Sequence, residues 1–144
     1  MNLLKPLTAV WVCGAAACAA LPAPVGVLAQ NEVRWFRAER LNAEDGSVAQ
    51  TSLLSVQGLA NGQSRWLLAD AFGAPQARLT AGAQGWQADG FAPPNRAAKQ
   101  LFAALAPLIQ QGTPLPPTLR TPAALWRLTP IAVSYTHLRA HETS

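Results

Sequence analysis

Apolar and polar positions alternate in short segments from Glu32 onwards, and turn residues interrupt these segments at intervals of about ten residues. Alternation of this kind is typical of antiparallel strands that bury one face. Asp45-Gly46 and Asn61-Gly62 can adopt the positive φ that a tight hairpin needs. The pattern therefore predicts a meander of five strands, within residues 32–41, 48–58, 64–72, 73–82 and 84–91.

The faces of these strands predict where the core lies. In the third segment Trp66 and Leu68 share one face, whereas Leu67 lies on the other. Apolar side chains on both faces predict that this strand is buried on both sides. In the fourth segment Leu79 lies on the face opposite Arg78 and Thr80, and in the fifth Trp86 lies inward while Gln87 faces outward.

A helical pattern follows within residues 93–114. Asn95 is a suitable N-cap, and Gly112 is a suitable residue to end the last turn. Pro107 falls inside the pattern and predicts a kink or a split into two shorter helices. The apolar residues of this segment form one stripe, which we expect to lie on the sheet: Leu101, Phe102, Leu105, Leu108 and Ile109.

A second, short helix is predicted within residues 121–128, with Thr121 as its cap and Pro122 in its first turn. The segment between the two helical patterns is rich in proline and is expected to be extended. The pattern as a whole predicts a mainly β protein, in which an antiparallel meander is covered by one or two helices.

Length and charge restrict the classes of protein that this chain can belong to. Its 144 residues have room for one domain, and half of them are apolar, so a core can form. The net charge of +4 is spread along the chain without a run of Lys and Arg. Nucleic-acid binding usually needs a clustered basic stripe, so we expect no nucleic-acid partner.

The first thirty residues are typical of an export signal. Lys5 precedes an apolar run from Leu7 to Leu21, and small residues follow this run. The run is rich in alanine and is shorter than the roughly 20 strongly apolar residues that a membrane span requires. The chain is therefore expected to be exported to the bacterial cell envelope.

The export signal has two alternative ends. Cleavage after Ala29 would make residues 1–29 the signal and would release a soluble periplasmic protein. Alternatively, the stretch AAAC resembles a lipobox, which would make residues 1–17 the signal, Cys18 the lipidated first residue and residues 18–31 a flexible tether. Ala19 then resembles the sorting signal of an outer-membrane lipoprotein that faces the periplasm.

The remaining chemistry does not predict an enzyme, a cofactor or a metal site. Cys13 and Cys18 both lie in the leader, so the folded part has no disulfide and no thiol chemistry. Asp70 and Asp89 end neighbouring strand segments and could form a carboxylate pair for acid-base catalysis. No catalytic base and no group that could hold a substrate lies near them in the sequence. We therefore expect both carboxylates to end strands, where they face water or cap a turn.

Tryptophan is the residue type that stands out in the folded part. Trp35, Trp66 and Trp86 fall on predicted strands, and Trp126 falls on the predicted short helix. A half-open sheet lined by such side chains could hold an acyl chain, because ligand sites are mostly apolar concavities. The alternative is that the tryptophans fill the core between sheet and helix and leave no room for a ligand.

The segment RWLLADAFGAPQARLTAGAQGWQADGF, followed by AAKQLFAALAPLI, resembles the central part of the LolA/LolB-like superfamily. It is closer still to uncharacterised bacterial lipoproteins grouped with that superfamily as a domain of unknown function. Residues 70–73 and Gly85-Trp86 take the places of two turns of the family pattern, and residues 97–109 take the place of its helix.

The resemblance implies an incomplete antiparallel β-barrel, or half-barrel, with helices packed in its open side. Characterised members carry acyl chains of lipoproteins across the periplasm, so it implies a lipid or acyl chain as the partner, with Trp66, Leu68, Leu79 and Trp86 lining the cavity. No counterpart of the exposed apolar loop with which some members enter a membrane is recognisable in the sequence. The alternative within this fold is a structural or interaction lipoprotein with a filled interior.

The end of the chain carries both histidines, His137 and His141, followed by Glu142. Positions four apart share a helix face, so this spacing on its own would indicate a zinc or iron site.

Back-translation gives a different origin for this stretch. The peptide from Val133 to Thr143 resembles the translation, in one reading frame, of a transposon end joined to a sequencing adaptor. A match of this length is far more specific than a two-histidine spacing. We therefore expect residues 133–144 to be non-native and to hold no metal. The native domain would comprise residues 32–132, with its C-terminal strands missing.

Overall fold

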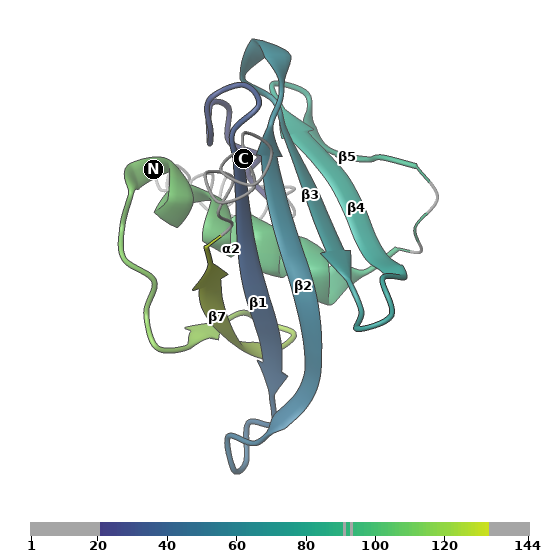
Figure 1. The fold of residues 1–144 in the computed structure, drawn as a ribbon, viewed down its shortest axis with the longest axis vertical. Coiled ribbons are helices and arrows are strands. Elements are labelled where there is room, and N and C mark those ends of the chain that lie inside the picture. Colours follow the sequence, from purple (N-terminus) through teal and green to yellow (C-terminus); the bar gives the residue numbers. More distant parts are fainter. Residues whose placement is uncertain (1–20, 91, 93, 133–144) are drawn as a thin grey trace, which may run out of the picture.

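A computed structural model describes residues 21–90, 92 and 94–132 of the chain. Cys18 and the two histidines, His137 and His141, lie outside the described residues. The described part is one antiparallel sheet with one long helix, α2 (Arg96–Gln111), packed against it (Figure 1). The strands are β1 (Val33–Leu41), β2 (Val48–Gly58), β3 (Ser64–Ala69), β4 (Pro75–Gly82), β5 (Gly85–Ala88), β6 (Leu119–Arg120) and β7 (Leu125–Ile131).

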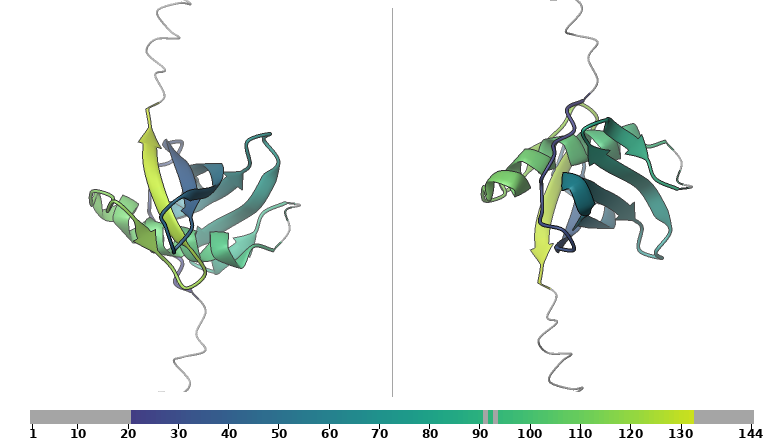
Figure 2. Two further views of the ribbon diagram at one scale, coloured as in Figure 1. Left: turned by 90° about the horizontal axis from the view of Figure 1, so that it is seen from below. Right: turned by 90° about the horizontal axis from the view of Figure 1, so that it is seen from above.

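The sheet has the order β5-β4-β3-β2-β1-β7-β6, so the first five strands form the predicted meander. Asn61 and Gly62, at φ values of 61° and 74°, form the turn into β3, and Gly46, at φ 74°, lies in the turn before β2. The sheet curls around α2, which lies on its concave side (Figure 2). The predicted fold class, a mainly β half-barrel with a helix in its open side, is confirmed.

The cap residues of α2 are those that the sequence predicts. The side chain of Asn95 accepts a hydrogen bond of 3.0 Å from the backbone N–H of Ala98. Gly112 adopts a left-handed φ of 67°, and its N–H donates to the carbonyl of Ile109. These contacts satisfy backbone groups that have no partner within the helix, which fixes where the helix begins and ends.

Pro107 neither splits α2 nor ends it, so the predicted split into two shorter helices is wrong. The helix continues for four residues beyond Pro107. Pro107 is exposed and cannot donate to the carbonyl of Ala103, but that carbonyl lies on the same side of the helix. Water can therefore take the place of the missing donor, while the opposite side of the helix stays packed on the sheet.

The predicted short helix over residues 121–128 is also wrong, because the second half of this segment, residues 125–128, belongs to strand β7. The register pairs Ala38 with Leu128 and Glu39 with Arg127, so β7 extends the sheet beyond β1. Eight residues are too few to hold a helix by propensity alone, so the strand edge of β1 decides the outcome.

The core lies between the concave face and α2. Side chains that alternate inward from the strands meet the apolar stripe of the helix, and the largest of these are fully buried: Leu54, Val56, Trp66, Leu101, Phe102 and Leu105. The indole N–H of Trp66 donates to the hydroxyl of Ser64 at 2.9 Å, which satisfies a buried donor. Leu67 on the convex face is only half-buried, so the expected burial of β3 on both sides is not found at this residue.

The segment before β1 packs on the domain, which differs from the flexible tether expected for residues 18–31. Val27 and Leu28 are buried at 5% and 8% exposure and belong to the core. The N–H of Gly26 donates to the carbonyl of Gly62 at 2.7 Å. Gly58 of β2 lies so close to the backbone of Ala29 that a Cβ at this position would stand 2.8 Å from the Ala29 carbonyl carbon.

Candidate functional site

The four residues expected to line a cavity lie together on the concave face. The register pairs Trp66 of β3 with Leu79 of β4, and Ala81 of β4 with Trp86 of β5. Trp66 and Leu68 are exposed by only 0% and 2%, whereas Leu79 and Trp86 are half-buried. The structure therefore places Trp66 and Leu68 in the core and leaves Leu79 and Trp86 accessible.

An aromatic cluster joins these residues to the helix. The ring centroid of Trp66 lies 5.6 Å from that of Trp86 and 5.3 Å from that of Phe102, and the Trp66–Trp86 pair is edge-to-face. Aromatic pairs at such separations attract each other beyond their area of contact. The indole N–H of Trp86 also donates to the carbonyl of Pro22 at 2.7 Å, so the cluster has a fixed position.

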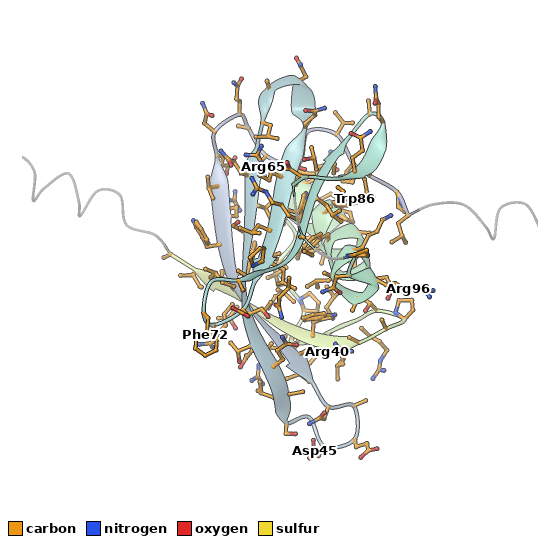
Figure 3. The ribbon with its side chains drawn as sticks, turned by 90° about the vertical axis from the view of Figure 1, so that its right-hand side faces the viewer. Arg40, Asp45, Arg65, Phe72, Trp86 and Arg96 are labelled. Atoms are coloured by element: carbon orange, nitrogen blue, oxygen red, sulfur yellow. The ribbon has the colours of Figure 1, made fainter. Side chains whose placement is uncertain are left out.

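Leu79 and Trp86 border a cavity of about 380 Å³ near the beginning of α2. We name it the cationic cavity, because its walls are apolar and three basic side chains line it. Figure 3 shows Trp86 and Arg96 on this side of the molecule. The complete lining is Ala77, Arg78, Leu79, Trp86, Ala88, Ala92, Pro94, Asn95, Arg96 and Lys99.

A second cavity, of about 480 Å³, lies near the end of α2, between the helix and the paired strands β1 and β7. We name it the apolar cavity. Its apolar side chains are Val33, Trp35, Phe36, Leu108, Ile109, Pro114, Leu115, Pro130, Ile131 and Ala132. Local sequence patterns do not indicate this cavity, because it depends on the pairing of β7 with β1, and the pattern of residues 121–128 predicts a helix.

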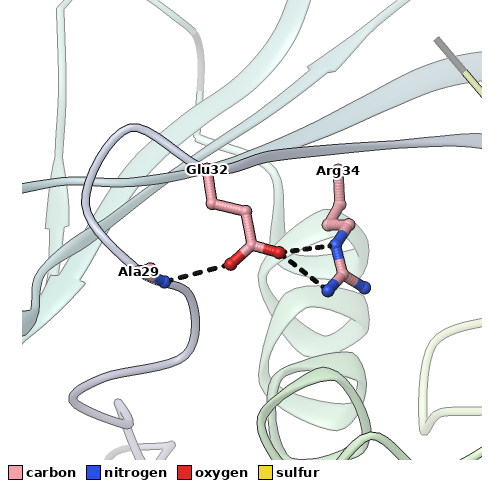
Figure 4. Close-up of polar contacts among 3 residues, drawn as sticks. All are labelled: Ala29, Glu32 and Arg34. Atoms are coloured by element: carbon pink, nitrogen blue, oxygen red, sulfur yellow. Dashed lines mark hydrogen bonds and ion pairs between the residues drawn. The ribbon is translucent and has the colours of Figure 1, made fainter. Parts of the chain in front are cut away.

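The charged residue that lines the apolar cavity already has a partner. The guanidinium of Arg34 donates to one carboxylate oxygen of Glu32 at 2.8 and 3.0 Å, and the N–H of Ala29 donates to the other at 3.2 Å (Figure 4). These bonds, chiefly those from Arg34, hold the pKa of Glu32 below its ordinary value. The apolar cavity therefore has no uncompensated charge among the described residues of its lining.

Asp70 and Asp89 are not brought together. Asp70 follows the end of β3, where its carboxylate accepts hydrogen bonds of 2.9 Å from the N–H groups of Phe72 and Ala74. Asp89 accepts from Arg65 near the start of β3 at 2.7 Å, and this bond lowers its pKa more than burial raises it. Asp70 lies five positions beyond Arg65 along the chain, roughly 16 Å of extended backbone, so the two carboxylates cannot share a proton or a water.

The sequence interpretation missed one exposed apolar side chain. Phe72 is 95% exposed at the tip of the turn between β3 and β4, and Figure 3 shows it pointing away from the sheet. The bonds that Asp70 accepts fix the shape of this turn. The sequence signal for this exposed side chain is a large apolar residue, Phe72, within the turn between Asp70 and Gly73.

Within the described ranges, no group of three or more His, Cys, Asp or Glu side chains could hold a metal ion. Among those same residues, no helix combines the length and the apolar character needed to cross a membrane. Comparisons of the chain with protein-family models, with curated proteins and with solved structures found no match. The resemblance to the LolA/LolB-like superfamily therefore stays a prediction.

Proposed function

We propose that this protein binds the acyl chain of a lipid between its curved sheet and α2, as an envelope protein of the LolA/LolB-like kind. The observation that carries the proposal is the pair of apolar-walled cavities at the two ends of α2, of about 480 and 380 Å³. Both volumes fall within the range of about 300–1,000 Å³ that is usual for small-ligand sites. Hydrophobic walls with few polar groups suit an acyl chain better than a polar metabolite.

The exposed Phe72 supports a role at a membrane surface. A fully exposed aromatic side chain on a turn of fixed shape has no packing role in the domain. Aromatic side chains favour the interface between lipid and water. Phe72 is therefore suited to bring the protein into contact with a bilayer from which it takes or to which it delivers a lipid.

A second candidate function is a structural or interaction protein with a filled interior. Full burial of Trp66 and Phe102 favours this alternative, because the centre of the half-barrel is already packed. A ligand that enters from either end would have to stay outside this centre or displace the helix. Binding measurements separate the two functions directly.

We expect the purified chain to retain a radiolabelled twelve-carbon chain, supplied as the alcohol or as the acid, in near-stoichiometric amount. Leu115→Trp should fill the apolar cavity and Ala88→Trp the cationic cavity, so each should lower retention in its own cavity. Gln50→Trp adds the same side chain at an exposed strand position that lines neither cavity and serves as the control. Equilibrium dialysis measures all four proteins.

Absence of retained label from either probe at saturating concentration would contradict lipid binding and leave the filled-core alternative. Equal retention by the control and both filled variants would place the lipid outside these cavities.

We propose that the protein is anchored through Cys18 and resides in the outer membrane, facing the periplasm. Packing of the segment before β1 supports this choice of processing site. Cleavage after Ala29 would remove Val27 and Leu28 from the core and the carbonyl of Pro22 from Trp86. Cleavage before Cys18 retains all of these contacts.

Incorporation of labelled palmitate in a bacterial host tests the anchor. The wild-type chain should carry label in the membrane fraction, and Cys18→Ala should lose it. Cys13→Ala is the matched control, because this cysteine lies upstream of the proposed processing site and should leave labelling intact. An unlabelled wild-type protein in the periplasmic fraction would show that cleavage follows Ala29 instead.

A further inference from the structure

We propose that the cationic cavity selects an anionic single-chain amphiphile, a fatty acid, whose chain lies on Leu79 and Trp86 and whose carboxylate meets Arg96 and Lys99. This inference rests on the proposed function and names the class of ligand for one of the two cavities. The two halves of the site come from different parts of the fold, since β4 and β5 supply the apolar wall and α2 supplies the cations.

The two cations of α2 are available to a ligand. Arg96 is exposed and Lys99 is half-buried, and neither forms an ion pair with a described residue. They stand three residues apart, so they lie on the same side of the first helical turns. Asn95 already occupies the N–H of Ala98, so the side chains, more than the open end of the helix, would bind the anion.

The third basic residue of the lining is partly compensated. Arg78 lies 3.6 Å from Asp89, but the same carboxylate oxygen accepts a shorter bond of 2.7 Å from Arg65. No acidic residue lies among the described residues that line the cavity. The rim of the cavity therefore carries a net positive charge, and an apolar ligand with an anionic head is electrostatically complementary to it.

The two cavities differ in this property. The apolar cavity has one basic residue in its lining, Arg34, and Glu32 neutralises it through two hydrogen bonds. An uncharged chain should therefore enter either cavity, whereas a carboxylate at its end should favour the cationic one. This difference provides an internal control within the same protein.

The size of the cationic cavity favours one acyl chain over two. Its volume of about 380 Å³ lies near the lower end of the usual range for ligand sites. The Trp66–Trp86–Phe102 cluster closes the way towards the centre of the half-barrel. A diacyl lipid would have to place its second chain outside this wall, so we commit to a single-chain carboxylate.

Isothermal titration of the full chain tests the proposal, with dodecanoate, dodecanol and dodecyltrimethylammonium as probes below their micelle concentrations. Dodecanoate should bind about tenfold more tightly than the other two probes, because two exposed ion pairs together contribute a factor of this order. High salt should reduce the difference, since the charges are near the surface. Vesicles of phosphatidylglycerol are tested as a fourth ligand, because this lipid presents an anionic head group with two acyl chains.

Two variants with the same chemical change identify the cavity. Arg96→Gln together with Lys99→Gln should remove the preference for dodecanoate, whereas Arg34→Gln at the apolar cavity should preserve it. All three substituted residues are at least partly exposed, so thermal unfolding should be unchanged and should verify the fold. Ala88→Trp should weaken binding of dodecanoate by filling the cavity.

Four outcomes overturn the proposal. The first is equal affinity for dodecanoate and dodecanol, and the second is an unchanged preference for dodecanoate in the Arg96/Lys99 double variant. The third is an equal loss of this preference in Arg34→Gln. The fourth is binding of vesicles as tight as that of dodecanoate, with the same dependence on Arg96 and Lys99. Binding of dodecanol alone would overturn this inference and leave the proposed function intact. Failure of every acyl probe to bind would contradict both this inference and the proposed function.

Discussion

Replacing Phe102 with alanine is expected to lower the free energy of unfolding by about 3–5 kcal/mol. Phe102 is fully buried and is the helix residue that closes the aromatic cluster with Trp66 and Trp86. Its loss removes apolar contacts on the concave face and leaves a cavity that close-packed neighbours refill only in part. Urea unfolding followed by tryptophan fluorescence measures the change, because two tryptophans contact the substituted residue.

Phe72→Ala is the matched control, since it removes the same side chain from a position that is 95% exposed. We expect it to change the free energy of unfolding by no more than about 0.5 kcal/mol. It should instead weaken adsorption to lipid vesicles if Phe72 contacts a membrane. Similar destabilisation by the two substitutions would show that α2 does not pack on the sheet as described.

A chain that begins at Gln30 is expected to be less stable than one that begins at Ala19 by about 3 kcal/mol or more. Its missing segment includes the buried side chains of Val27 and Leu28, each of which contributes through burial of apolar surface. The hydrogen bonds from Gly26 to the carbonyl of Gly62 and from Trp86 to the carbonyl of Pro22 are lost as well. Chemical denaturation of the two purified chains measures the difference.

Val27→Ala and Val25→Ala provide a matched pair within the longer chain. Val27 is 5% exposed and Val25 is 46% exposed, so the first substitution should destabilise the domain and the second should have a small effect. Equal unfolding midpoints for the two truncated chains would show that the segment before β1 is dispensable. Cleavage after Ala29 would then be compatible with a stable domain, and the structural support for anchoring at Cys18 would fall.

Local signals in the sequence were sufficient for the meander and for the ends of the helix. Each hairpin turn depends on residues that tolerate a positive φ, such as Asn61 and Gly62, and the cap of α2 depends on one side-chain oxygen of Asn95. These are short-range effects, so they can be read from neighbours in the chain. Placement of the apolar stripe of α2 on the sheet follows from the same local periodicity.

Contacts between distant parts of the chain determine the structural features that the sequence pattern did not predict. β7 forms because the free edge of β1 offers backbone partners to a segment whose own propensity is weak, as the pairing of Ala38 with Leu128 shows. Val27 packs on the domain although its segment has the composition of a tether. Such long-range pairing depends on strand edges and packing, which neighbouring residues in the sequence do not reveal.

The same distinction between local and long-range effects applies to the candidate site. Alternation along the strands placed Trp66, Leu68, Leu79 and Trp86 on one face, and the sequence by itself determined that face. Only the tertiary structure decided which of the four side chains α2 covers, where two cavities remain at its ends, and that Arg96 and Lys99 stand beside one of them. The reason is that burial and charge pairing depend on how helix and sheet meet, and that contact joins residues far apart in the chain.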